Sequence, residues 1–153
     1  MIFEHKIGEY VKYISICNEK GIKVEKKTIR KIVSGLINEL KINVKYLEIS
    51  FVASETLLVI NKKYLHHNFR TDIITFDYSI ERNNLDGEIL ISFADAVENS
   101  KKYRVSVENE LLRLVVHGIL HLIGYDDTSS TKRKKMKKVE NELVQKLRIN
   151  EKT

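Results

Sequence analysis

The sequence predicts an α+β fold in which a four-stranded mixed sheet is packed by about five helices. Strand-like and helix-like segments follow each other without strict alternation, which favours α+β over a regular α/β repeat. The chain has 153 residues, of which 42% are hydrophobic, so it is long enough to bury a substantial core. It contains no proline, only six glycines, no obvious linker and no internal repeat. We therefore expect residues 1–153 to form a single domain.

Four segments have the composition of strands, because they are rich in β-branched and aromatic residues. Along one of them, Leu47, Ile49 and Phe51 alternate with polar residues, which is typical of a half-buried strand. The last two segments are joined by a polar stretch around Asn83 and Asn84, which favours a hairpin. The predicted strands cover 11–17, 46–52, 72–78 and 87–93.

Five further segments predict helices, because their apolar residues recur at helical spacing. The fourth is apolar on nearly every side, so we expect it to be buried. The predicted helices are one near 26–41, one that begins near Ser54, a short one over 94–103, a long one from about Val107 to Ile123, and a last one near 129–148.

The bulk properties exclude some classes of protein. No stretch reaches the roughly 18–20 apolar residues of a membrane-spanning helix, and the first residues lack the pattern of a signal peptide. The single cysteine, Cys17, cannot form an intrachain disulfide. We therefore expect a cytoplasmic protein without membrane contact. The net charge of +6 suits a nucleic-acid partner, although 21 interspersed acidic residues equally suit an ordinary solvated surface.

The informative segment is the end of the long apolar helix and the turn after it. His117 and His121 are four residues apart, so a helix places both imidazoles on one face, one turn apart. Gly124 can adopt the left-handed conformation that ends a helix. The chain then returns Asp127 toward the histidines. Three protein ligands with a fourth position left open are typical of catalytic zinc.

Alternatives to this metal site stay open at this point. Asp126 is the rival third ligand. A histidine pair at this spacing is also common in helices that bind no metal. Gly118 costs a helix about 1 kcal/mol relative to alanine, which suggests that another element or a substrate approaches the backbone closely there. A His2Asp set also accepts nickel, iron or cobalt in place of one Zn²⁺.

The ligand spacing also resembles that of HExxHxxGxxH metalloproteases, in which a glutamate after the first histidine is the general base. Gly118 occupies that position here, so peptide hydrolysis loses its main support. Metal-assisted hydrolysis of a phosphodiester fits a basic protein better.

Several motifs together resemble one known family. The segment 117–126, HGILHLIGYD, is similar to the HGxLHLxGYDH signature of the YbeY family. The segments 71–76, 86–92 and 61–64 resemble other motifs of that family in the same order. The resemblance implies a zinc-dependent endoribonuclease that takes part in ribosomal RNA maturation and ribosome quality control. It also implies RNA and ribosomal small-subunit or assembly proteins as partners.

The chain departs from the family pattern at two positions. Asp127 stands where the family has a histidine, and aspartate is itself a sound zinc ligand. Leu65 stands where many members have an arginine that is important for activity. Arg70 is the nearest replacement, and we expect it to contact a substrate phosphate, the alternative being a solvated loop arginine. Asp72 is one candidate for a general base, because it lies near the same loop.

Other residues have weaker interpretations. His66 and His67 are in the loop before Arg70 and could approach the metal. The run 132–135, KRKK, begins the last helix and could hold RNA phosphates, or it could be an ordinary solvated helix face. Two functions besides the ribonuclease stay open: a zinc metalloprotease-like hydrolase, and a ribosome-assembly factor in which zinc is only structural.

Overall fold

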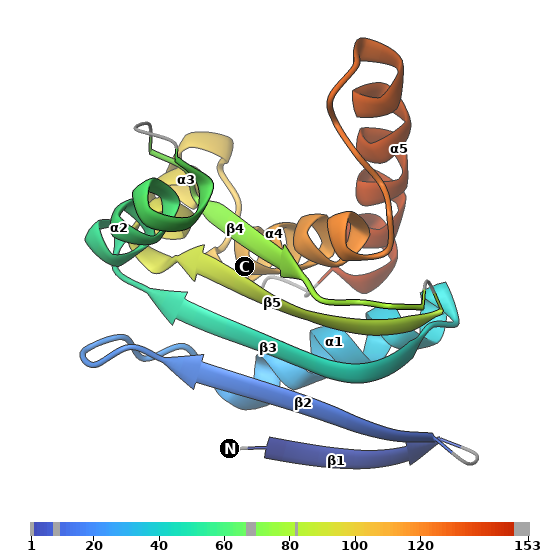
Figure 1. Ribbon diagram of the computed structural model, residues 1–153. Helices are drawn as coiled ribbons and strands as arrows, with labels where there is room; N and C mark the ends of the chain where they lie inside the picture. The colour runs from blue at the N-terminus through green and yellow to red at the C-terminus, as the bar shows by residue number, and fades with distance from the viewer. Residues whose placement is uncertain (1, 8–9, 67–69, 82, 149–153) are drawn as a thin grey trace.

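A computed structural model of the chain describes residues 2–7, 10–66, 70–81 and 83–148. Its strands form one sheet in the order β1-β2-β3-β5-β4 (Figure 1). The central pairs, β2 with β3 and β3 with β5, are parallel, whereas the two outer pairs are antiparallel. The strands are β1 (Ile2–Ile7), β2 (Tyr10–Asn18), β3 (Asn43–Val52), β4 (Ile73–Asp77) and β5 (Asn84–Ser92).

The α+β class, the mixed sheet and the five helices are confirmed, and all four predicted strands belong to the sheet. The expected hairpin is the antiparallel pair of β4 and β5. Among the described residues the sheet also contains a fifth strand, β1, one more than the four that were predicted. An edge strand is held by backbone hydrogen bonds to a single neighbour, here β2, and it needs no alternating apolar pattern of its own.

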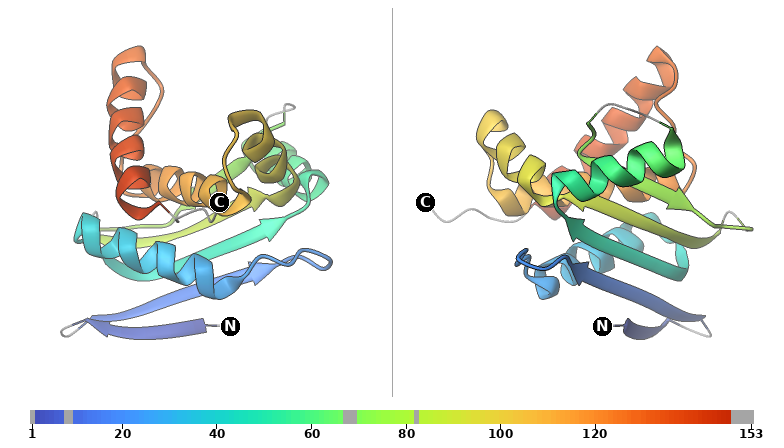
Figure 2. Two further views of the ribbon diagram at one scale, coloured as in Figure 1. Left: turned by 180° about the vertical axis from the view of Figure 1, so that it is seen from behind. Right: turned by 60° about the vertical axis from the view of Figure 1, so that its left-hand side comes forward.

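The helices are distributed over both faces of the sheet (Figures 1 and 2). Helices α1 and α4 share the larger core with Ile49, Phe51 and Ile89 of the central strands. Helix α2 packs on the other face, where Leu57 meets Val52 and Ile74. The helices are α1 (Lys26–Leu40), α2 (Ser54–Leu65), α3 (Phe93–Tyr103), α4 (Val107–Leu122) and α5 (Ser130–Leu147).

Helix α4 is the central helix, with α1, α3 and α5 packed around it and β4 and β5 beneath it. Gly118 lies against the sheet: a Cβ added there would meet Ile89 Cδ1 at 2.9 Å and Ile73 Cδ1 at 3.2 Å. The close backbone approach expected at this glycine is therefore that of the sheet. The missing side chain lets α4 lie directly on β5 and β4, which fixes where its remaining faces point.

A glutamate from a distant loop caps helix α2. The carboxylate of Glu19, which follows β2, accepts hydrogen bonds from the Ala53 backbone N–H at 2.5 Å and from Thr56 Oγ1 at 2.6 Å. A glutamate three positions into a helix commonly serves the N-cap N–H in this way. The hydrogen bonds from Thr56 and Ala53 lower the pKa of Glu19. This contact holds the start of α2, and therefore one wall of the cleft described below, against the end of β2.

Glu19→Gln tests this cap. Because the folded-state pKa of Glu19 is lowered, its ionised form stabilises the fold above the unfolded-state pKa of about 4.3, and the contribution is lost as the pH falls through the folded-state value. We expect the variant to be less stable by about 1 kcal/mol at pH 7 in urea unfolding, with a difference that disappears as the pH falls through the lowered folded-state pKa of Glu19. Glu98→Gln, at an exposed carboxylate on α3, is the control. A difference that persists at low pH would contradict the assignment.

Candidate metal centre

The two histidines occupy the one face of α4 that is not buried. From Asn109 to Leu122 every residue is buried except Arg113, His117 and His121, which follow each other at intervals of four. The two imidazole rings lie 4.7 Å apart between centroids, and their Nε2 atoms are 3.1 Å apart. About a quarter of each side chain is exposed. Both rings therefore present a nitrogen to the same opening.

The glycine turn places an aspartate beside them. Gly124 has a φ of +107°, in the left-handed region that glycine adopts readily. The backbone N–H groups of Gly124 and Tyr125 bond the carbonyls of His121 and Leu120, which closes the end of α4. The chain then reverses, and Asp127 Oδ2 comes to 3.6 Å from His121 Nε2. One ligand atom from each of His117, His121 and Asp127 lies within 4.8 Å of the other two.

The rival carboxylate of Asp126 has other partners. Its Oδ1 accepts hydrogen bonds from the backbone N–H and the hydroxyl of Thr128, both at 2.7 Å, and its Oδ2 accepts one from Lys132 Nζ at 3.2 Å. These contacts, the backbone bond of Thr128 first, lower the pKa of Asp126 to about 2. Asp126 thus organises the turn into α5, and the structure groups Asp127 with the histidines.

The three side chains fit a small divalent cation. Zinc binds nitrogen and oxygen at 2.0–2.2 Å, so ligand atoms in a tetrahedral set lie about 3.4 Å apart. Two of the three separations, 3.1 Å between the histidines and 3.6 Å between His121 and Asp127, bracket that value, and all three ligand atoms lie within 4.8 Å of one another. Burial, and then the neighbouring His117, lower the pKa of His121, which favours the neutral imidazole that a metal requires. The donor set therefore suits zinc without a large rearrangement.

The ligand atoms open into a cleft rather than into a closed core. A cavity of about 560 Å³ contains His117, His121 and Asp127. Its opposite wall is formed by the end of α2 and by β4 with the residues just before it. The wall residues are Asn61, Leu65, Thr71, Asp72, Ile73, Ile74 and Thr75. A substrate group can therefore reach the metal ligands from solvent.

The candidate residues of the loop between α2 and β4 lie in different surroundings. Arg70 is 67% exposed, and its Nη2 bonds Asp95 Oδ1 at the start of α3 at 3.0 Å; it is not among the residues that line the cleft. Asp72 does line the cleft, and its Oδ2 accepts a hydrogen bond from Asn99. His66 ends α2 with a φ of +57°, and His67 lies outside the described residues.

Sequence reasoning missed the charged groups that surround His117. Glu140 of α5 is 1% exposed, and its Oε1 lies 2.6 Å from His117 Nδ1. Its Oε2 accepts a hydrogen bond from Lys137 Nζ at 2.9 Å and lies 3.8 Å from Arg113 Nη1. The sequence did contain one sign of this contact. Glu140 stands between Met136 and Leu143 on the apolar stripe of α5, where a buried carboxylate requires a partner.

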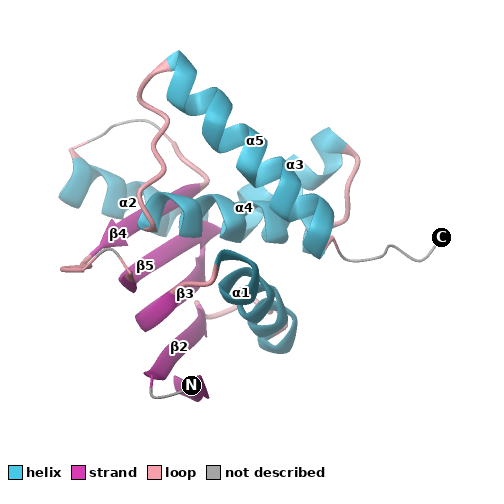
Figure 3. Cartoon of the chain, turned by 90° about the vertical axis from the view of Figure 1, so that its right-hand side faces the viewer, coloured by secondary structure: helices cyan, strands magenta, loops and turns pink. Residues whose placement is uncertain are grey.

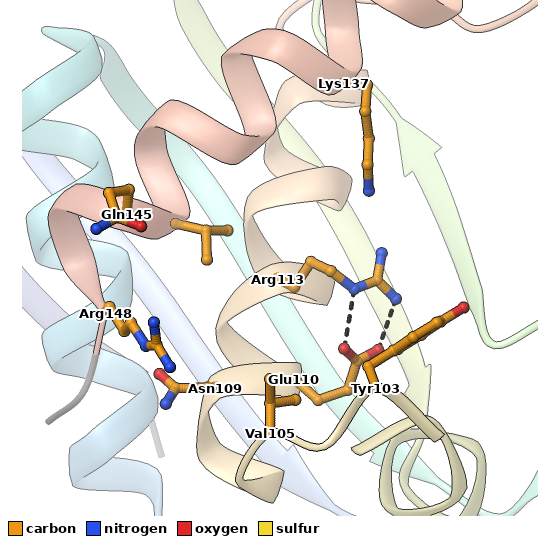
Figure 4. A pocket seen from close by; sticks show the side chains of 9 residues that line it. Tyr103, Val105, Asn109, Glu110, Arg113, Lys137, Gln145 and Arg148 are labelled. Atoms are coloured by element: carbon orange, nitrogen blue, oxygen red, sulfur yellow. Dashed lines mark hydrogen bonds and ion pairs between the residues drawn. The ribbon is translucent and has the colours of Figure 1, made fainter. Parts of the chain in front are cut away.

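Arg113 connects this cluster to the base of α4. It donates two hydrogen bonds to Glu110, at 2.9 and 2.5 Å, in the fork geometry seen in Figure 4. Glu110 is itself 1% exposed and also accepts a hydrogen bond from Asn99, the residue that bonds Asp72. A continuous polar network thus runs from the cleft wall along α4 to the carboxylate behind His117.

The basic run at the start of α5 lies beside the same turn. Ser129 caps the helix by accepting a hydrogen bond from the Lys132 backbone N–H, which offsets positive charge at a helix N-terminus. Lys132 bonds Asp126, and Arg133 Nη1 donates to the Asp127 carbonyl. The run is exposed, so its remaining charge faces solvent next to the candidate ligands.

In the described part of the chain, no helix has the length and apolar character needed to cross a bilayer.

Comparison with known proteins gives a consistent result. The family model described as Endoribonuclease YbeY matches residues 14–148. A protein of Flavobacterium johnsoniae named Endoribonuclease YbeY is 42% identical over 113 residues, which cover 74% of this chain and 77% of that protein. The protein of the same name from Bacteroides fragilis is 42% identical over 94 residues, or 61% of this chain and 67% of its own.

A solved structure agrees with the fold. The solution structure of TM1509 from Thermotoga maritima matches with a TM-score of 0.62 and 26% sequence identity, covering 88% of each chain. The family match extends from β2 to the end of α5 and includes the histidine helix, the glycine turn and the strands that form the cleft. This chain is a member of the YbeY family.

Proposed function

We propose that this protein is a metal-dependent endoribonuclease, a single domain that takes part in ribosomal RNA maturation and ribosome quality control. The observation that carries the proposal is the convergence of His117, His121 and Asp127 at the floor of an open cleft. Its relatives are named Endoribonuclease YbeY, which supports RNA as the substrate. Ribosomal RNA as the natural target and ribosomal small-subunit or assembly proteins as partners are part of the same proposal.

One Zn²⁺ is the proposed metal, although nickel, iron or cobalt could occupy the same donors. When bound, such an ion supplies Lewis acidity that polarises a water molecule and a phosphate oxygen. The residues of the chain hold it: two neutral imidazoles give affinity, and one carboxylate reduces the charge of the site. Three protein ligands leave room for substrate, which favours a catalytic over a purely structural role.

Beside the cleft, the surface of the chain offers contacts for a phosphate backbone. Arg70 is an exposed cation whose pairing with Asp95 contributes about 0–1 kcal/mol, so a substrate phosphate can take its place at little cost. The lysine-rich start of α5 adds positive charge beside the ligand turn. Asp72 puts a carboxylate in the cleft wall, where it can accept a proton from the attacking group.

A peptide substrate is a weaker alternative. The proteolytic glutamate would have to stand at position 118, and a Cβ there would point at the sheet, 2.9 Å from Ile89 Cδ1 and 3.2 Å from Ile73 Cδ1. This helix face is turned to the sheet, so no side chain at position 118 reaches the cleft. The second alternative, a ribosome-assembly factor with structural zinc, is separated by the experiments below.

The ligand assignment is tested by two neighbouring aspartates. We expect Asp127→Asn to weaken Zn²⁺ binding by on the order of 100-fold, because a charged ligand is lost. Asp126→Asn should weaken binding far less, because it removes no ligand and only loosens the turn that carries Asp127. Competition with a chromogenic chelator measures both dissociation constants. The reverse pattern would assign the third ligand to Asp126.

The activity is tested with an unstructured RNA and an unstructured protein, each with and without chelator. We expect chelator-sensitive cleavage of the RNA alone.

Arg70→Ala should raise KM for RNA about 10-fold, as for loss of one charge-assisted hydrogen bond, with Zn²⁺ affinity unchanged. Lys31→Ala on α1, a lysine outside the cleft, is the control.

Cleavage of the protein but not of the RNA would overturn the proposal. If ribosomal RNA processing in cells persists with an Asp127→Ala protein that has lost its metal, catalysis by this site is excluded and the assembly-factor alternative stands.

A further inference from the structure

The buried carboxylate behind His117 has a geometry that packing alone does not explain. Glu140 shares the inward face of α5 with Met136 and Leu143, the other two buried residues of that helix. Figure 3 shows α5 lying across α4, and Met136 and Leu143 share the core with buried residues of the histidine helix. An apolar side chain would suit the position better, because burying a charge is costly unless it is paired and hydrogen-bonded.

One oxygen of Glu140 is directed at one nitrogen of one candidate ligand, and the other oxygen faces the cations Lys137 and Arg113. Its Oε1 lies 2.6 Å from His117 Nδ1, a short distance typical of a charge-assisted hydrogen bond. Its other oxygen accepts a hydrogen bond from Lys137. The second nitrogen of His117, Nε2, faces the opposite way, toward His121 Nε2. The imidazole is therefore held between a carboxylate on one side and the ligand cluster on the other.

This arrangement fixes the protonation pattern of the ring. An ionised carboxylate only accepts hydrogen bonds, so Nδ1 of His117 carries a proton and donates it to Glu140. A neutral imidazole then has its lone pair on Nε2, the atom that lies among the other ligand atoms. A carboxylate behind a metal-binding histidine orients the ring and increases its basicity in this way.

We propose that Glu140 is the positioning residue of the metal centre: it sets the tautomer and the ring orientation of His117 and thereby determines metal affinity. The inference depends on the proposed function only in taking His117 as a metal ligand. It makes α5 part of the site, although Glu140 lies 23 residues after His117 in the sequence. The Lys137 contact holds the outer oxygen of the carboxylate, so that Oε1 stays directed at the ring.

The test uses the full chain and Zn²⁺ alone. Glu140→Met fills a similar volume without charge, and it leaves Arg113 bonded to Glu110 and Lys137 exposed to solvent, so no cation is buried without a partner. We expect its Zn²⁺ dissociation constant, from chelator competition, to rise roughly 10–100-fold, and that of Glu140→Gln to rise less. Glu142→Gln, at an exposed glutamate of the same helix, should bind as the wild type does.

A second measurement separates positioning from a structural role. Nitrogen-15 NMR of the metal-free protein should find the His117 proton on Nδ1, and Glu140→Met should lose this preference while urea unfolding shows a folded protein. Folded variants with wild-type Zn²⁺ affinity would overturn the inference, as would a wild-type His117 proton on Nε2.

His121→Ala distinguishes this failure from that of the proposed function. If His121→Ala also binds Zn²⁺ normally, the metal centre itself is wrongly assigned. If it loses Zn²⁺ while the Glu140 variants keep it, only the positioning role fails.

Discussion

The close contact between α4 and the sheet at Gly118 is the constraint on which the site depends. The backbone of α4 lies so near the sheet that a methyl group at position 118 would meet Ile89 Cδ1 at 2.9 Å and Ile73 Cδ1 at 3.2 Å, and these side chains would have to shift. With that face fixed against the sheet, and α1, α3 and α5 packed around the helix, one narrow strip remains open. Arg113, His117 and His121 occupy it at successive turns. The glycine therefore determines which way the histidines point.

The second constraint is the way in which the two ends of the site are held. On the cleft side, the glycine turn after α4 brings Asp127 to the histidines while Asp126 secures the turn through Thr128 and Lys132. On the side of His117 that faces away from the other ligands, Glu140 contacts the ring nitrogen Nδ1. Because both contacts come from the segment that starts after Gly124, the docking of α5 and the geometry of the ligands are coupled.

Local patterns in the sequence predicted the parts of the site that lie on one segment. The spacing of the two histidines, Gly124 and Asp127 is a property of one helix and its turn. The structure brings the side chains of His117, His121 and Asp127 together. The strands and helices were predicted for the same reason. The strand β1, the Glu19 cap of α2 and the contact of Glu140 with His117 join segments that are distant in sequence. No periodicity encodes such pairs, although a glutamate on an apolar helix stripe was a sign of one of them.

The central claim is that His117, His121 and Asp127 bind one metal ion together. X-ray absorption spectroscopy of the zinc-loaded full chain tests it most directly. The account predicts four or five light ligands at about 2.0–2.2 Å, with the multiple-scattering signature of two imidazoles that falls to one in His121→Ala. A spectrum with sulfur from Cys17, or one with two imidazoles unaffected by His121→Ala, would contradict it.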